Sequence, residues 1–149
     1  MRRLGLLLYL ALSGCLPMVV PGRLDVARRA ERPAVCESRQ ECDAVWPKAV
    51  DWVAHRCAFD IKTQTDSLVE TEGPAGAPST DVACRLERAP AHEAGQSQLE
   101  LTASCGNWFE CLPERDYFLA AFNDDMRAAI EASRAPATPP APAEAPPQP

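Results

Sequence analysis

The chain has 149 residues, of which 46% are hydrophobic, and this length fits one small domain. With a formal net charge of −6 and no basic cluster, it is a poor candidate for binding nucleic acid, and we expect no nucleic-acid partner. The negative charge is also repelled by anionic lipid headgroups, so any attachment to a membrane must have another cause.

The N-terminus has the order of a secretion signal. Two arginines at the start precede an apolar run, Leu4 to Leu12, which is far shorter than the roughly 20 residues that span a bilayer. A serine and a glycine then lead directly into Cys15. We therefore predict a signal peptide over residues 1–14 and export of the chain.

The segment that ends this run, LSGC from Leu12 to Cys15, resembles the lipobox of bacterial lipoproteins. In that family the cysteine thiol is joined to diacylglycerol, the peptide is cut before it, and the new amino terminus is acylated, as with palmitate. The resemblance implies that Cys15 is the lipidation site. Leu16, in place of the aspartate of an inner-membrane retention signal, predicts the outer membrane and its periplasmic face. The alternative is an ordinary signal peptide with a chance cysteine.

Composition divides the rest of the chain into three parts. Residues 15–35 are polar and interrupted by proline, as expected of a tether above the membrane. Residues 36–135 carry the periodic apolar pattern of a single domain. The tail over residues 136–149 is rich in alanine and proline, which predicts a disordered segment because burial cannot offset the entropy of ordering it. The alternative for the tail is a docking segment for a partner or for the cell wall.

Within the domain, apolar spacing predicts a helix over Asp43 to Arg56 and another over Glu114 to Ser133. Three stretches between them alternate with period two, as half-buried strands do: Cys57 to Val69, Val82 to Glu87, and Gln98 to Cys105. Each helix and the sheet must bury one apolar face. We therefore predict an α+β fold, a two-layer α-β-β-β-α sandwich with two helices on one face of a three-stranded antiparallel sheet.

Six cysteines follow Cys15, and an even number in an exported chain suggests disulfides. Four of them form two C-x5-C motifs, which the predicted topology places at the same end of the domain. We favour local pairing, Cys36 with Cys42 and Cys105 with Cys111. Crossed pairing between the motifs is the alternative, and it would stabilise the fold more because it closes longer loops.

Cys57 and Cys84 are predicted to stay apart. In a regular hairpin, Cys84 lies opposite about Ser67, some ten residues or roughly 33 Å from Cys57 along the strand. Because a disulfide needs Cα atoms within about 7 Å, we expect Cys84 to be a free, buried thiol. A bond between the two would mean that the predicted strand register is wrong.

No residues in the sequence have the context of a catalytic or metal site. His55, Cys57 and Cys84 could supply zinc ligands, but the C-x2-C spacing of structural zinc sites is absent. Neither histidine of the chain lies near a recognisable nucleophile motif. Asp124 and Asp125 are predicted on the solvated face of the second helix, without a cleft between carboxylates. We expect no enzymatic activity, no cofactor and no metal.

The most suggestive surface is the loop CGNWFEC, where Trp108 and Phe109 stand between two cysteines. A rigid loop that exposes tryptophan is typical of a contact site, so these two residues are the candidate partner surface. The alternative is that one ring caps the end of the core beside Trp46. The threonine-rich stretch IKTQTDSLVET is a predicted sheet edge, and such an edge can accept a partner strand.

Together, C-x5-C-x3-W-P-K-A from Cys36, IKTQTDSLVET, CGNWFEC and the AFN at 121–123 resemble a group of small proteobacterial lipoproteins with no assigned function. The likeness covers Cys36 to about Asn123, and Cys57 and Cys84 fall outside its pattern. It implies export and lipidation, and it supplies no activity.

Two hypotheses on function follow. The first is a lipid-anchored, non-enzymatic accessory module of the outer membrane, with an envelope protein as partner. The alternative is a periplasmic inhibitor or immunity-type protein against a hydrolase such as a lysozyme, since an acidic surface speeds association with a basic enzyme. The predicted helices favour the first, because lysozyme inhibitors are largely β. An exposed apolar patch would also favour the first, and an exposed acidic loop the second.

Overall fold

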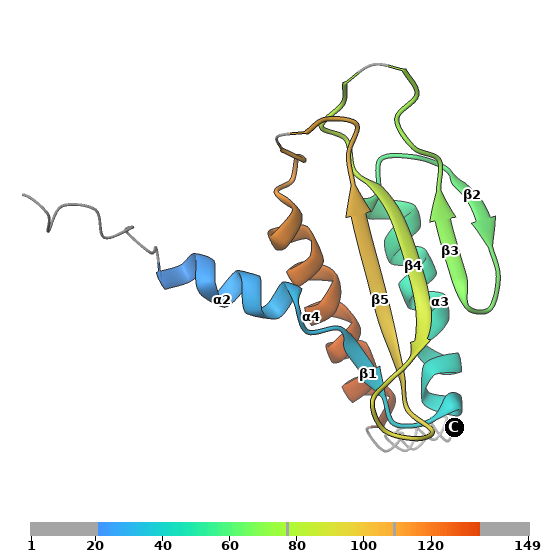
Figure 1. Cartoon of the computed structure of the whole chain (residues 1–149). Coiled ribbons are helices and arrows are strands. Elements are labelled where there is room, and N and C mark those ends of the chain that lie inside the picture. Colours follow the sequence, from blue (N-terminus) through green and yellow to red (C-terminus); the bar gives the residue numbers. More distant parts are fainter. Residues whose placement is uncertain (1–20, 77, 109, 135–149) are drawn as a thin grey trace, which may run out of the picture.

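The computed structural model describes residues 21–76, 78–108 and 110–134. In chain order these residues form α2 (Pro21–Ala30), β1 (Ala34–Cys36), α3 (Arg39–Arg56), β2 (Ile61–Gln64), β3 (Leu68–Thr71), β4 (Ala83–Pro90), β5 (Ser97–Ser104) and α4 (Arg115–Arg134). The five strands make one antiparallel sheet in the order β1-β5-β4-β3-β2 (Figure 1). The predicted α+β class is confirmed, whereas the number of strands and helices is larger than predicted.

The sheet has five strands instead of three because two segments depart from the predicted pattern. The stretch from Cys57 to Val69 contains a turn in which the Thr65 hydroxyl accepts the backbone N–H groups of Ser67 and Leu68 at 3.2 and 2.9 Å. Threonine favours such turns, and this one divides the predicted strand into the hairpin β2–β3. The other addition is β1, which pairs along the first residues of β5.

The extra hairpin reverses the direction of the strands that follow it. The prediction that both C-x5-C motifs share one end of the domain is therefore wrong. Cys36 lies opposite Ser97 at the start of β5, and Cys105 follows the last residue of that strand. The two motifs lie at opposite ends of β5 (Figure 1), whose eight residues span roughly 26 Å. That separation excludes the crossed pairing.

The disulfides of the described chain are three. Cys36–Cys42 and Cys105–Cys111 are local, which is the pairing that we favour from the sequence. The third joins Cys57 and Cys84, whose Cα atoms are 6.1 Å apart, so the expectation of a free thiol is wrong. Because β4 pairs with β3 and not with the residues directly after α3, the start of β4 returns to the end of that helix. There the N–H of Ala58 donates to the carbonyl of Val82 at 2.9 Å.

The packed part of the chain begins earlier than the predicted domain. Residues 15–35 are expected to form a tether, but the described part of that segment contains helix α2 and the start of β1. Helix α2 packs on α4 with Val26 buried, and its carbonyl groups at Arg29 and Ala30 each accept the Asn123 amide at 2.9 Å. The tether prediction fails because these partners come from the far end of the chain.

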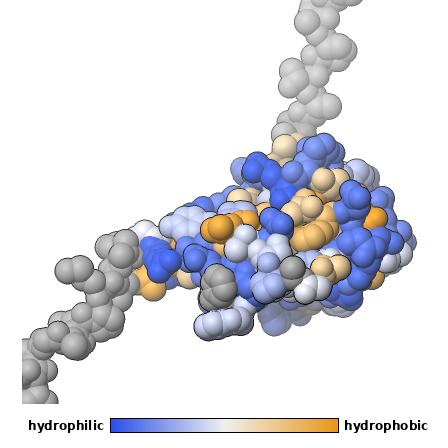
Figure 2. All heavy atoms as spheres, turned by 90° about the horizontal axis from the view of Figure 1, so that it is seen from above, coloured by the Kyte–Doolittle hydropathy of each residue, from blue (hydrophilic) through white to orange (hydrophobic). Residues whose placement is uncertain are grey.

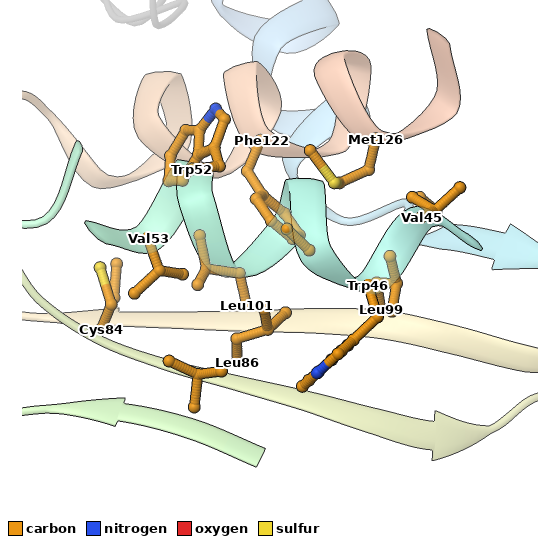
Figure 3. Packing of buried hydrophobic residues seen from close by; sticks show 14 of the residues in the cluster. Val45, Trp46, Trp52, Val53, Cys84, Leu86, Leu99, Leu101, Phe122 and Met126 are labelled. Carbon is orange, nitrogen blue, oxygen red and sulfur yellow. The ribbon is translucent and has the colours of Figure 1, made fainter. Parts of the chain in front are cut away.

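Helices α3 and α4 pack against one face of the sheet. Along β5, Leu99, Leu101 and Ala103 are buried, whereas Glu100 and Thr102 on the other face are exposed. Figure 3 shows side chains of both helices meeting those of the sheet in one core. Between the helices, the Trp52 ring makes edge-to-face contacts with Phe118 and Phe122, with centroids 5.0 and 5.1 Å apart.

Helix α3 begins four residues before the predicted start because Ser38 caps it. The Ser38 hydroxyl accepts the N–H of Glu41 at 3.2 Å, and the Glu41 carboxylate accepts the N–H of Glu37 at 2.6 Å. This arrangement is close to a capping box, which the S-x-x-E pattern at 38–41 indicates. Pro47 therefore lies inside the helix and not in its first turn.

Candidate functional site

The loop closed by the Cys105–Cys111 disulfide follows the end of β5 and is held in place by Asn107. The Asn107 side-chain amide donates to the carbonyl groups of Ser79 and Glu110, at 2.6 Å each. Its side-chain oxygen accepts the N–H of Glu110 at 2.8 Å. These bonds close the loop on itself and attach it to the segment that precedes β4.

Gly106 allows the same loop to approach that segment closely. A Cβ atom at this position would lie 2.7 Å from Cγ of Pro74, which is too close for a side chain, and in tight contact with the backbone nitrogen of Ser79 at 3.3 Å. Just beyond the disulfide, the N–H of Leu112 donates to the carbonyl of Thr80 at 2.9 Å. Pro74, Ser79 and Thr80 therefore support the described residues of the loop along one side.

Trp108 in this loop is 93% exposed, whereas Trp46 and Trp52 are 9% and 8% exposed. The alternative in which the Trp108 ring caps the core beside Trp46 is thus wrong. The Trp46 indole instead donates to the carbonyl of Thr65, at the β2–β3 turn, at 3.2 Å. Phe109, the other predicted contact residue, lies outside the described residues.

The segments that meet near this loop carry the exposed large hydrophobic side chains of the described chain. Among residues 21–76, 78–108 and 110–134, those with exposed fractions from 49% to 93% are Leu24, Trp108, Leu112 and Tyr117. They belong to the first turns of α2, to the loop and its continuation, and to the start of α4. These segments meet where the Arg23 guanidinium of α2 donates to both carboxylate oxygens of Glu114 at 3.1 Å. The sequence predicts only Trp108 of this group.

A shallow hollow of about 400 Å³ lies between these segments, and both Arg23 and Trp108 line it. Its charges are mixed, because Arg115 faces it together with Glu110 and Glu114. The hydrogen bond that Arg23 donates to the Glu114 carboxylate raises the pKa of Arg23 above its ordinary value. Seen from above, this end shows small hydrophobic areas among hydrophilic ones (Figure 2). An open, mixed surface of this kind suits contact with another surface better than enclosure of a small ligand.

Of the two residues that the sequence places on a solvated face, Asp125 is exposed and Asp124 is half-buried, and both also join α4 to other helices. Asp124 accepts hydrogen bonds from Arg29 and Arg127 at 2.5 Å, and Asp125 accepts the Trp52 indole N–H at 2.9 Å. Burial acts to raise the pKa of Asp124, but the hydrogen bonds from the two arginines outweigh it and lower that pKa. A carboxylate held ionised in this way is suited to a structural role and not to proton transfer.

The three residues weighed as zinc ligands do not form a site. Cys57 and Cys84 are bonded to each other, and Nδ1 of His55 lies 2.8 Å from the carbonyl oxygen of Asp51 in the preceding turn. In the part of the chain that the structure describes, no three side chains of histidine, cysteine, aspartate or glutamate are placed to hold a metal ion.

The threonine-rich edge strand is β2, and it is poorly suited to pairing with a partner. It has four residues, its register shifts between Ile61 and Thr63, and Lys62 on it forms an ion pair with Glu70 at 3.1 Å. Short length, a bulge and lysine are the features by which natural edge strands avoid pairing with other chains. The surface around Trp108 is therefore the better candidate contact site.

Comparisons with known proteins identify no relative: no family model, no curated protein and no solved structure matches the chain. Of the helices described, none is both long enough and apolar enough to cross a bilayer. Cys15, residues 1–14 and the tail over residues 136–149 lie outside the described residues. The resemblance to bacterial lipoproteins therefore stays a prediction.

Proposed function

We propose that this chain is a lipoprotein, anchored through Cys15 in the outer membrane, whose domain is a non-enzymatic binding module on the periplasmic side. The segment LSGC, which ends a short apolar run after two arginines, supports the anchor. Three disulfides in the domain support an oxidising compartment, in which such bonds form and persist.

The observation that carries the binding role is the exposure of Trp108 on a loop that a disulfide and the hydrogen bonds of Asn107 brace. A group that is ordered before contact loses little conformational entropy on binding, and tryptophan contributes a large contact area. The exposed apolar side chains around it favour an accessory module, whereas an inhibitor of a basic enzyme would favour an exposed acidic loop.

Lipidation is tested by producing the full chain in a Gram-negative host, with and without Cys15→Ser, and measuring intact mass and membrane fraction. We expect the wild type to lose residues 1–14, to gain diacylglycerol and one further acyl chain, and to enter the outer membrane. Cys15→Ser should gain no lipid mass. Leu16→Asp is the matched control, because it should keep the lipid and move the protein to the inner membrane. A processed chain with an unmodified Cys15 would contradict the proposal.

The binding role is tested by chemical crosslinking of the lipidated protein in intact envelopes, read by mass spectrometry. We expect one or a few outer-membrane proteins that are absent from a Cys15→Ser control. Recovery of a single basic hydrolase would instead support the inhibitor hypothesis, and recovery of nothing above the control would contradict a protein partner.

A further inference from the structure

We propose that the end of the domain that carries Trp108 lies against the lipid headgroups of the membrane that holds the acyl chains on Cys15. The domain would then be oriented by two contacts, one covalent lipid and one interfacial surface. This inference rests on the proposed lipidation of Cys15. It deepens the proposed binding role by naming the bilayer interface, in place of an envelope protein, as what the Trp108 surface contacts.

The first argument is the length of chain between the anchor and the domain. Only residues 16–20 separate Cys15 from Pro21, the first residue of α2. An extended chain advances at most about 3.6 Å per residue, so these two residues can be no more than roughly 22 Å apart. The N-terminal end of α2 must therefore stay close to the membrane surface, whatever path the intervening residues follow.

The second argument is what this end of the domain exposes. Arg23, in the first turn of α2, and Trp108 line the same hollow, so the loop lies at the end that the anchor holds near the membrane. The exposed large hydrophobic side chains of the described chain also belong to the segments that meet here. Tryptophan and tyrosine are enriched at the headgroup level of bilayers, where an apolar ring and a polar N–H or O–H group both find suitable surroundings. Trp108 and Tyr117 fit that environment.

The third argument is the local charge of α2. The helix carries three arginines and one aspartate, in contrast to the chain as a whole with its net charge of −6. Leu24 and Arg28 are both exposed and lie one turn apart on the side away from Val26, which packs on α4. An apolar residue beside a basic one suits an anionic headgroup layer, in which arginine keeps its charge in water. Arg23 and Arg29 are paired with Glu114 and Asp124 of α4, so Arg28, which forms no ion pair with the described residues, is the arginine of this helix that faces the headgroups.

The same geometry favours lipid over protein as the occupant. A surface within reach of the anchor faces the bilayer and is the part of the domain least accessible to a periplasmic protein. The bonds that Asn107 makes to Ser79 and Glu110 brace the loop beside Trp108, which lowers the entropy lost when the ring inserts at the headgroup level.

Fluorescence of the full-length, lipidated protein tests the inference. The chain has three tryptophans, and Trp108→Phe removes the exposed one while leaving Trp46 and Trp52 in the core. The protein is placed in vesicles of phosphatidylethanolamine with about one-third phosphatidylglycerol, with or without lipids brominated near the headgroup. We expect brominated lipid to quench the Trp108 component, obtained by difference between wild type and Trp108→Phe, about twofold or more.

A matched control moves the exposed tryptophan to the polar face of the sheet, by combining Trp108→Phe with Thr102→Trp. Thr102 is exposed on β5, and a tryptophan there should be quenched by aqueous iodide and not by brominated lipid. The inference would be overturned if Trp108 of the vesicle-bound protein were quenched by aqueous iodide and not by brominated lipid. That result would mean that the Trp108 surface is open to a protein partner. Equal quenching by brominated lipid at both positions would also overturn it, because the domain would then have no fixed orientation.

The intact mass of the same sample separates this failure from failure of the proposed function. A mature chain without acyl groups refutes the anchor itself. A chain that carries the acyl groups and binds vesicles, but whose Trp108 is quenched only by iodide, refutes the interfacial contact alone.

Discussion

The two C-x5-C loops share their length and their disulfide closure but lie in opposite environments. Cys36 and Cys42 are completely buried, and the residues between them begin helix α3. At the other end of β5, the residues between Cys105 and Cys111 form a loop in which Trp108 is 93% exposed. One loop is part of the core, and the other presents a side chain to the surroundings.

The difference comes from the five residues inside each loop. The sequence ESRQE in the first contains a serine and a glutamate at capping-box spacing, so the chain turns directly into a helix. The sequence GNWFE in the second has a glycine where the backbone approaches Pro74, and an asparagine that braces the loop. Cysteine spacing therefore predicts which loops a disulfide closes. The residues between the cysteines decide whether such a loop packs into the core or exposes a side chain to solvent.

The largest expected effect is the loss of the buried disulfide. Cys36→Ala combined with Cys42→Ala should lower the free energy of unfolding by about 3–4 kcal/mol, since loop closure contributes about 2.4 kcal/mol and the void in the core adds to it. Cys105→Ala with Cys111→Ala should lower it by about 2 kcal/mol, because Cys111 is 8% exposed and Cys105 is only partly buried, so the void is smaller. Urea unfolding followed by circular dichroism measures both. Equal losses would contradict the distinction between the loops.

The next expected effect concerns the close approach of the exposed loop. Gly106→Ala places a Cβ atom 2.7 Å from the Pro74 ring, which cannot move aside easily, and should lower stability by about 1–2 kcal/mol. Gly73→Ala is the matched control, because a Cβ atom there meets nothing within 4 Å, and it should change stability by less than about 0.5 kcal/mol. Hydrogen exchange of amides 105–111 should accelerate in the first variant only. If both variants behave alike, the loop is not fixed by this contact.

What the sequence predicts of this fold is its local part. Helix α4, Arg115–Arg134, begins and ends within one residue of the prediction, because a proline and one continuous apolar stripe define it. The apolar pattern does not define which residues pair between strands: Leu86 lies opposite Leu101, and pairing it with Leu99 would bury the same residues. A shift of two residues preserves the buried face, so the apolar pattern cannot detect it.

The predictions of strand direction and of the N-terminal tether are wrong because contacts between residues far apart in the sequence determine these parts of the fold. Period-two alternation continues through Thr63 and Thr65, so the pattern gives no sign that the chain turns between β2 and β3. Because this turn is missing from the prediction, the predicted directions of β4 and β5 are opposite to the observed ones. The predicted position of Cys84, far from Cys57, is wrong for the same reason. Helix α2 looks like a polar tether because its arginines find their carboxylate partners, Glu114 and Asp124, more than 90 residues away in the sequence. At the candidate contact site, residue type and cysteine spacing are enough to predict Trp108. The other exposed side chains of the segments around it cannot be predicted in this way, because their exposure depends on how α2 packs on α4.

A smaller effect is expected at the cap of α3. Ser38→Ala removes the hydroxyl that accepts the Glu41 N–H at 3.2 Å and should lower the free energy of unfolding by about 1 kcal/mol. Ser104→Ala, at the exposed end of β5 just before the other loop, serves as the control and should have an effect below about 0.5 kcal/mol. Urea unfolding compares the two. A Ser38→Ala variant as stable as the control would mean that the disulfide alone sets the helix start.

The smallest expected effect is a pH dependence of the free energy of unfolding, and it comes from Glu41 in the loop closed by Cys36 and Cys42. The hydrogen bond from Arg134 lowers the pKa of Glu41 below its ordinary value of 4.5, burial opposes this, and the N–H of Glu37 lowers it further. The folded state thus binds a proton at this group less readily than the unfolded state. The resulting stability is fully present above the unfolded pKa and is lost as the pH falls through the folded one.

Glu41→Gln isolates this contribution, because glutamine keeps the shape of the side chain and does not ionise. Between about pH 5 and pH 3 the wild type should lose more stability than the variant, by at most about 1 kcal/mol, since the contact with Arg134 lies near the surface. Both proteins keep Asp124, whose lowered pKa adds the same slope to each curve and cancels in the difference. Urea unfolding at a series of pH values gives the two curves. Parallel curves would show that the Glu41–Arg134 contact does not join the first loop to α4 energetically, and the buried loop would then depend on its disulfide and its cap alone.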